Sequence, residues 1–188
     1  MRWASPFKHF SEAARIRSIA VTFMMSVILL LVMHTLDGPL KSQFAPRGIV
    51  SFELAGNYEV SRQILNSWNA EARIYAALSL GLDYLFLIVY ALFISLSCMQ
   101  VGKALGANHS FLPGIALFLA GAQFLAAALD AIENWALIHL LLNTSRRWLP
   151  GLARWCAMLK FSIVTAGLIF IFGGLIAVGI KKSLKRPA

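Results

Sequence analysis

Long apolar runs separated by short polar segments dominate the chain. Four of these runs cover about residues 18–36, 74–100, 113–142 and 155–180. A helix rises 1.5 Å per residue, so about 20 apolar residues are enough to cross about 30 Å of hydrocarbon. The pattern therefore predicts an all-α protein, with residues 1–188 forming one membrane domain built as a bundle of four transmembrane helices.

The segment before the first run has a different pattern. Trp3, Phe7 and Phe10 recur at helical spacing, and charged residues such as Lys8 and Arg15 lie between them. An apolar face opposite a basic face is typical of a helix that lies in the membrane interface. We expect a short amphipathic helix on the cytoplasmic surface.

Residues 37–73 form the one long polar segment, and prolines and glycines interrupt it. Asn57 is a good N-cap residue for a helix from Tyr58 to about Asn66. The stretch 49–55 is apolar apart from one serine and Glu53, so we expect it to lie against the mouth of the bundle or to dip into it. The segment is predicted to be a partly helical external loop.

Composition supports a membrane protein. The chain is 59% hydrophobic and 13% charged, with a mean hydropathy of +0.72, whereas soluble domains average about 25% charged residues. The net charge of +9 comes from basic residues at helix ends and tails, where lipid headgroups attract them. Because no basic stripe with interleaved aromatic residues is present, we expect the lipid bilayer, and no nucleic acid, as a partner.

Orientation follows from the distribution of Lys and Arg. The two tails and the second loop hold nine of them, and the first and third loops hold seven. Cytoplasmic segments carry the excess of these residues. The chain is therefore predicted to be a multi-pass membrane protein with both termini in the cytoplasm.

Small residues recur on the last two runs. Gly114, Gly121 and Ala128 are spaced by seven on the third run, and Gly167 and Gly174 belong to a glycine-rich stretch of the fourth. Small residues let membrane helices approach closely. We expect these two helices to form the tight centre of the bundle through these positions.

Four ionisable residues lie inside the predicted spans: Asp83, Asp130, Glu133 and Lys160. An Asp or Lys in the middle of a span costs about 2.5–3.5 kcal/mol on insertion scales. Counted from the span ends, all four lie in one layer of the outer half of the bilayer. Asp130, Glu133 and Asn134 are spaced i, i+3 and i+4, which places them on one helix face.

Three acids against one lysine leave an excess of negative charge, and Glu53 is expected at the mouth of the same layer. We predict a buried site that binds a small cationic or amphipathic ligand, with Lys160 as counter-ion and Asn134 as orienter. One alternative is an intramembrane enzyme that modifies a lipid or isoprenoid with a carboxyl acid/base pair. Another is a structural or accessory subunit in which the charges fix helix register, with a homo-oligomer or a membrane-protein partner.

The sequence predicts no cofactor and no metal site. His34 and His139 near the outer ends of two spans are the one possible haem pair, but His139 lies about half a helical turn away from the face of Asp130. Glu53, Asp83 and the two acids of the third span are the one possible set of oxygen ligands for a divalent cation. No spacing typical of zinc ligands occurs.

Five segments in this order carry a resemblance: residues 49–55, 64–68, 83–90, 130–134 and 159–161. Together they resemble a group of small bacterial four-helix integral membrane proteins, and the Asp-x-x-Glu-Asn step from Asp130 to Asn134 is the sharpest element. The resemblance implies the four-helix architecture and a bacterial inner-membrane setting, and it implies nothing about chemistry.

Overall fold

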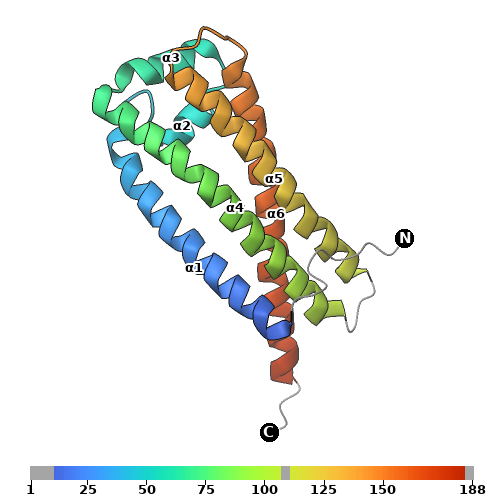
Figure 1. Ribbon diagram of the computed structural model, residues 1–188. Coiled ribbons are helices and arrows are strands. Elements are labelled where there is room, and N and C mark those ends of the chain that lie inside the picture. The colour runs from blue at the N-terminus through green and yellow to red at the C-terminus, as the bar shows by residue number, and fades with distance from the viewer. Residues whose placement is uncertain (1–10, 107–110, 185–188) are drawn as a thin grey trace.

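The computed structural model describes residues 11–106 and 111–184. All the secondary-structure elements in these residues are helices (Figure 1). The elements follow in the order α1 (Glu12–Asp37), the 3-10 helix η1 (Gly38–Leu40), α2 (Ile49–Glu53), α3 (Tyr58–Ser67), α4 (Ala70–Gly106), α5 (Leu112–Leu141) and α6 (Leu149–Leu184). The described residues contain no strand. The all-α prediction is confirmed.

Four of these helices, α1, α4, α5 and α6, are long and apolar enough to cross a membrane. They contain the four predicted spans, although most extend beyond the apolar runs because polar residues continue a helix outside the hydrocarbon. Local caps set several ends. The Ser11 side chain accepts from the amide of Ala14 at the start of α1, and Asn57 accepts from the amide of Val60 at the start of α3, as predicted.

The predicted interfacial helix at the N-terminus falls mostly on residues 1–10, which lie outside the described residues. Residues 12–17, which the prediction included in that helix, continue without a break into α1. The interfacial helix therefore stays a prediction.

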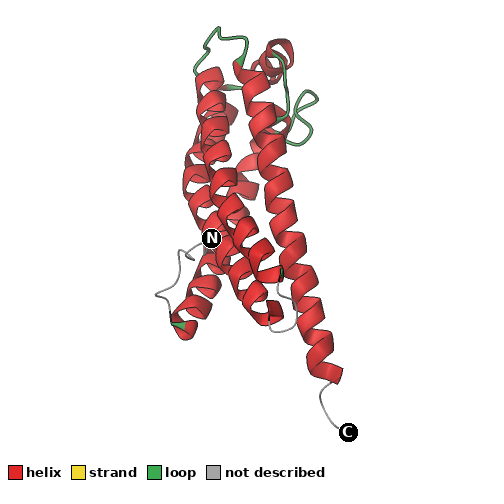
Figure 2. Ribbon diagram, turned by 90° about the vertical axis from the view of Figure 1, so that its right-hand side faces the viewer, coloured by secondary structure: helices red, strands yellow, loops and turns green. Residues whose placement is uncertain are grey.

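Helix α4 is the centre of the bundle. It packs against α1, α5 and α6, whereas α1 rests mainly on α4 (Figure 1). Figure 2 shows that α6 extends past the other helices at the end where the C-terminus lies. Because α4 touches three helices, its most apolar window is also the most buried of the four spans.

The expected role of the small residues is only partly correct. A Cβ placed on Gly167 or Gly174 would meet side chains of α4 or α5, so these two glycines of α6 do allow close packing. Gly114 and Gly121 of α5 have no atom of another element within 4 Å of an added Cβ and lie on the exposed side of the helix. The side of α5 that faces the bundle carries Ala116, Ala120, Gln123, Ala126 and Asp130 instead.

The segment between α1 and α4 closes one end of the bundle. We call residues 38–69, which contain η1, α2 and α3, the cap; it lies at the end opposite to Glu12 and Leu184 (Figure 1). Its apolar side chains join the ends of α4, α5 and α6 in one buried cluster. The prediction that residues 49–55 pack against the bundle mouth is consistent with this arrangement, because Phe52 and Glu53 are both buried.

A buried charge cluster as the candidate functional site

Helix α5 brings three polar side chains into the interior on one face. Asp130, Glu133 and Asn134 are each at most 2% exposed. Their i, i+3, i+4 spacing places them side by side, and α5 packs against α4 on one side and α6 on the other. This face of α5 therefore carries the polar cluster between its two neighbours.

Lys160 of α6 joins the two acids of α5. Its Nζ lies 2.5 Å from Oδ1 of Asp130 and 2.9 Å from Oε2 of Glu133. The lysine is itself buried. Ion pairs in a low-dielectric interior are strong only when their remaining polar atoms are also hydrogen-bonded. The two acids differ in this respect.

Asp130 is well satisfied. Lys160 donates to its Oδ1, and the hydroxyl of Tyr90 on α4 donates to its Oδ2 over 3.1 Å. Both oxygens of this buried carboxyl group have a hydrogen-bond donor. Asp130 therefore ties α4, α5 and α6 together at one point.

Glu133 is not satisfied in the same way. Its side chain is fully buried, and Oε1 has no hydrogen-bond donor in the described part of the chain. The contact of Oε2 with Lys160 is close enough for an ion pair but lacks hydrogen-bond geometry. A buried acceptor without a donor costs about 1–3 kcal/mol, and more when it is charged.

Asp83 of α4 pairs with Asn134. The amide Nδ2 of Asn134 donates to Oδ2 of Asp83 over 2.7 Å, and no other described residue hydrogen-bonds to this aspartate. The amide oxygen of Asn134 is buried and also lacks a donor. Next to this pair, the hydroxyl of Tyr84 donates to the carbonyl of Ala131 over 3.2 Å, which links α4 to α5.

Glu53 reaches the cluster from the cap. Helix α2 packs against α5 and α6, and the side chain of Glu53 is buried with Oε2 lacking a donor among the described residues. Burial raises the pKa of Glu53 above its ordinary value of 4.5, and the positive charge of Lys160 opposes that rise. The negative charges of Asp130 and Asp37 add to it.

The structure thus brings all six predicted site residues to one region: Glu53, Asp83, Asp130, Glu133, Asn134 and Lys160. If every carboxyl were ionised, four negative charges would face one lysine. Such an excess is strongly unfavourable away from water. The cluster therefore requires protons or a bound cation to balance it.

The geometry does not support either of the two cofactor alternatives, a divalent cation or a haem. No group of three or more His, Cys, Asp or Glu within residues 11–106 and 111–184 is arranged to hold a metal ion. His34 lies on an exposed face of α1. The ring of His139 stacks on Trp135, with 4.5 Å between the ring centroids.

Two interior polar residues were not assigned a place from the sequence. The hydroxyl of Tyr90 completes the bonding of Asp130, and Gln123 of α5 is fully buried with its Nε2 donating to the carbonyls of Leu119 and Ile163. Gln123 lies seven residues before Asp130 and therefore on the same helix face. That spacing is the signal that could have identified it.

Comparisons with protein-family models, with curated proteins and with solved structures gave no match.

Proposed function

We propose that this multi-pass membrane protein binds a small cationic ligand in the charge cluster between α4, α5, α6 and the cap. The observation that carries the proposal is a set of buried acceptor oxygens without donors among the described residues: Oε1 of Glu133, Oε2 of Glu53 and Oδ1 of Asn134. A guest with N–H donors and a positive charge would donate to these oxygens and cancel one of the excess negative charges, and protons on the remaining carboxyls would balance the rest.

The cluster divides into two halves with different roles. Asp130, Tyr90 and Lys160 bond to one another, so this half supports the alternative in which charges fix helix register. Glu133, Glu53 and Asn134 hold the atoms without donors, so this half would contact the ligand. Lys160 lies between the two halves and pairs with one acid of each, Asp130 and Glu133. It supplies one positive charge of its own, so the ligand would not be the sole counter-charge for the acids.

Binding can be tested on purified protein in lipid nanodiscs by calorimetric titration with methylammonium, butylammonium and dodecylammonium. We expect saturable binding of at least one of these ions, and Glu133→Gln is expected to weaken it by at least about tenfold, which is a loss of about 1.4 kcal/mol. Glu59→Gln is the matched control, because it removes the same charge from an exposed position of α3.

Two outcomes would overturn the proposal. One is that no ammonium ion binds. The other is that Glu133→Gln and Glu59→Gln bind equally well while both remain folded, as judged by thermal unfolding. Either outcome would favour the accessory-subunit alternative, in which the cluster only holds the helices together.

We also propose that both termini lie in the cytoplasm and that the cap faces the periplasm, in a bacterial inner membrane. The proposal rests on the excess of Lys and Arg in the tails and the second loop. Alkaline phosphatase, which is active only outside the cytoplasm, should be inactive when fused after Ala188 and active when fused within the cap. The reverse pattern would contradict this orientation.

A further inference from the structure

The cluster is closed along the bundle axis on the cap side. The cap and the helix ends form an apolar core between the cluster and the water beyond, and several of its members are completely buried: Leu40, Ala45, Phe52, Ala76, Ala136, Leu137, Leu149 and Ala153. Trp68 packs edge-on against Phe52 and donates its indole N–H to the carbonyl of Leu40 over 2.8 Å. A ligand that came from this side would have to unpack the core.

The cap is also fastened to α1. Oδ1 of Asp37 accepts from the amide of Ile49 over 2.7 Å. Gly48 precedes this amide with a φ of 54°, and any Cβ there would collide with the Asp37 carboxylate. Glycine is the residue that adopts this conformation without strain, so the sequence at this point favours a closed cap.

The cluster is closed toward the chain termini as well. A second apolar core lies there between α4, α5 and α6, and its buried members are Leu87, Tyr90, Ala91, Ile94, Cys98, Val101, Ala120 and Ile171. Each end of the bundle therefore has a buried apolar core.

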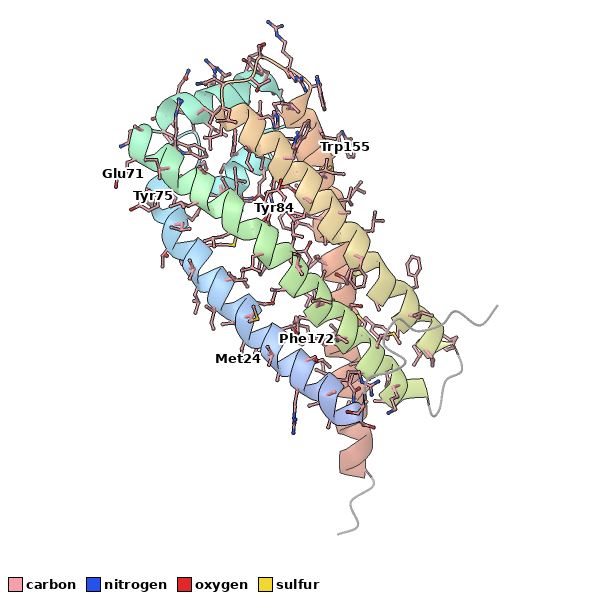
Figure 3. The ribbon with its side chains drawn as sticks, viewed as in Figure 1. Met24, Glu71, Tyr75, Tyr84, Trp155 and Phe172 are labelled. Carbon is pink, nitrogen blue, oxygen red and sulfur yellow. The ribbon has the colours of Figure 1, made fainter. Side chains whose placement is uncertain are left out.

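The side wall between α4 and α5 is thin at the level of the cluster. Tyr84 is 36% exposed, and Figure 3 shows its side chain between these two helices. Its single hydrogen bond, to Ala131, joins the two helices there. An added Cβ on Gly81, one turn before Tyr84 on the same helix, would meet no atom within 4 Å, so the surface of α4 is open at that position.

Directly next to this tyrosine lies the pair of Asp83 and Asn134, which has one buried acceptor oxygen without a donor. Asp83 is adjacent to Tyr84 in sequence and has Asn134 as its hydrogen-bond partner, while Oδ1 of Asn134 is the oxygen without a donor. The seam between α5 and α6 is different, because the ion pairs of Lys160 with Asp130 and Glu133 cross it.

From this placement, and resting on the proposed binding function, we infer that the ligand is a lipid-dissolved amphipathic amine that enters sideways between α4 and α5, with Tyr84 as the gate. The ammonium group donates first to Asp83 and to Oδ1 of Asn134, and then to Glu133. The alkyl chain stays in the bilayer against exposed apolar residues of the two helices, such as Leu85 of α4 and Ile132 of α5. The amine must carry N–H donors, because a quaternary ammonium ion cannot satisfy an acceptor oxygen.

The experiment compares two head groups on the probe and two variants of the protein, one at the proposed gate and one at the attachment of the cap. The probes are 12-bromododecylammonium and its trimethylammonium analogue, both added to nanodiscs that contain the protein, with bromine quenching of tryptophan fluorescence followed in time. Trp135 is exposed on α5 close to the seam and serves as a reporter. Tyr84→Phe removes the hydrogen bond of the gate, and Asp37→Asn weakens the fastening of the cap.

We expect saturable quenching by the primary ammonium ion and only the linear background with the trimethylammonium analogue. Tyr84→Phe should raise the rates of binding and release together by about fivefold, the effect of one neutral hydrogen bond, and leave the equilibrium affinity nearly unchanged. Asp37→Asn should leave both rates unchanged.

The inference fails if Asp37→Asn accelerates binding while Tyr84→Phe does not, because the ligand would then pass through the cap from water. It also fails if butylammonium, added from water, binds as tightly as the bromododecyl probe. Both results would leave the proposed site intact, provided that Glu133→Gln still abolishes saturable quenching. Loss of sensitivity to Glu133→Gln would instead overturn the proposed function itself.

Discussion

Lys160 of α6 and Asp130 of α5 make the shortest polar contact of the interior, with 2.5 Å between Nζ and Oδ1. Both side chains are buried, and Tyr90 bonds the second oxygen of the aspartate. This contact joins α5 to α6 at Asp130, on the same face of α5 as Glu133 and Asn134.

Replacing Lys160 with methionine should therefore destabilise the protein strongly. The change leaves Asp130 and Glu133 buried without a cation, and breaking a buried pair in this way typically costs about 3–5 kcal/mol. Thermal unfolding in detergent would measure the loss. The double variant Lys160→Met with Asp130→Asn should recover part of it, and a double variant less stable than Lys160→Met alone would contradict the pairing.

The Asp83–Asn134 hydrogen bond should appear as an energetic coupling. Asn134→Leu is expected to lower the free energy of unfolding by about 1–3 kcal/mol, because Asp83 loses its partner inside the bundle. In a double-mutant cycle with Asp83→Leu, the combined loss should be smaller than the sum of the single losses. Strict additivity would show that the two side chains do not interact.

Glu53 should make stability depend on pH. Burial raises its pKa above 4.5, so the folded state holds this proton more tightly than the unfolded state does. The free energy of unfolding should then fall as the pH rises above 4.5, up to the folded-state pKa. Glu53→Gln removes this contribution, so its stability relative to the wild type should increase as the pH rises from 4.5 toward the folded-state pKa of Glu53.

The comparison needs a control for the other carboxyl groups. Glu59→Gln alters an exposed glutamate of α3 and should follow the wild-type pH profile. If Glu53→Gln also follows the wild-type profile, the Glu53 carboxyl does not titrate differently in the folded and unfolded protein.

Two neighbouring glycines of α6 should respond differently to alanine. A Cβ on Gly174 would lie 2.1 Å from Cγ1 of Val101, whereas one on Gly173 would meet nothing within 4 Å. Gly174→Ala is expected to lower the free energy of unfolding by about 1–3 kcal/mol, and Gly173→Ala should change it little. Equal effects on thermal unfolding would show that α6 does not pack on α4 through Gly174.

The sequence predicted the elements of the fold well for a simple reason. An apolar run such as residues 74–100 is long enough to cross hydrocarbon only as a helix with all its backbone groups bonded internally, so its length alone specifies the element. The cap helix after Asn57 was predictable because its N-cap is a local interaction. The convergence of Asp83, Asp130, Glu133 and Lys160 was also predictable, since ionisable groups in a membrane face the interior.

The sequence determined the spans and the layer of the charges, and the tertiary structure decided the facing of apolar residues and the bonding inside the cluster. In lipid, apolar side chains are equally stable on the outside and the inside of a bundle, so the spacing of Gly114 and Gly121 could not show that both face outward. The division of the cluster depends on distances of a few tenths of an ångström between three helices and the cap. These distances satisfy Asp130 and leave Oε1 of Glu133 without a donor, and only the packing of α4, α5 and α6 sets them.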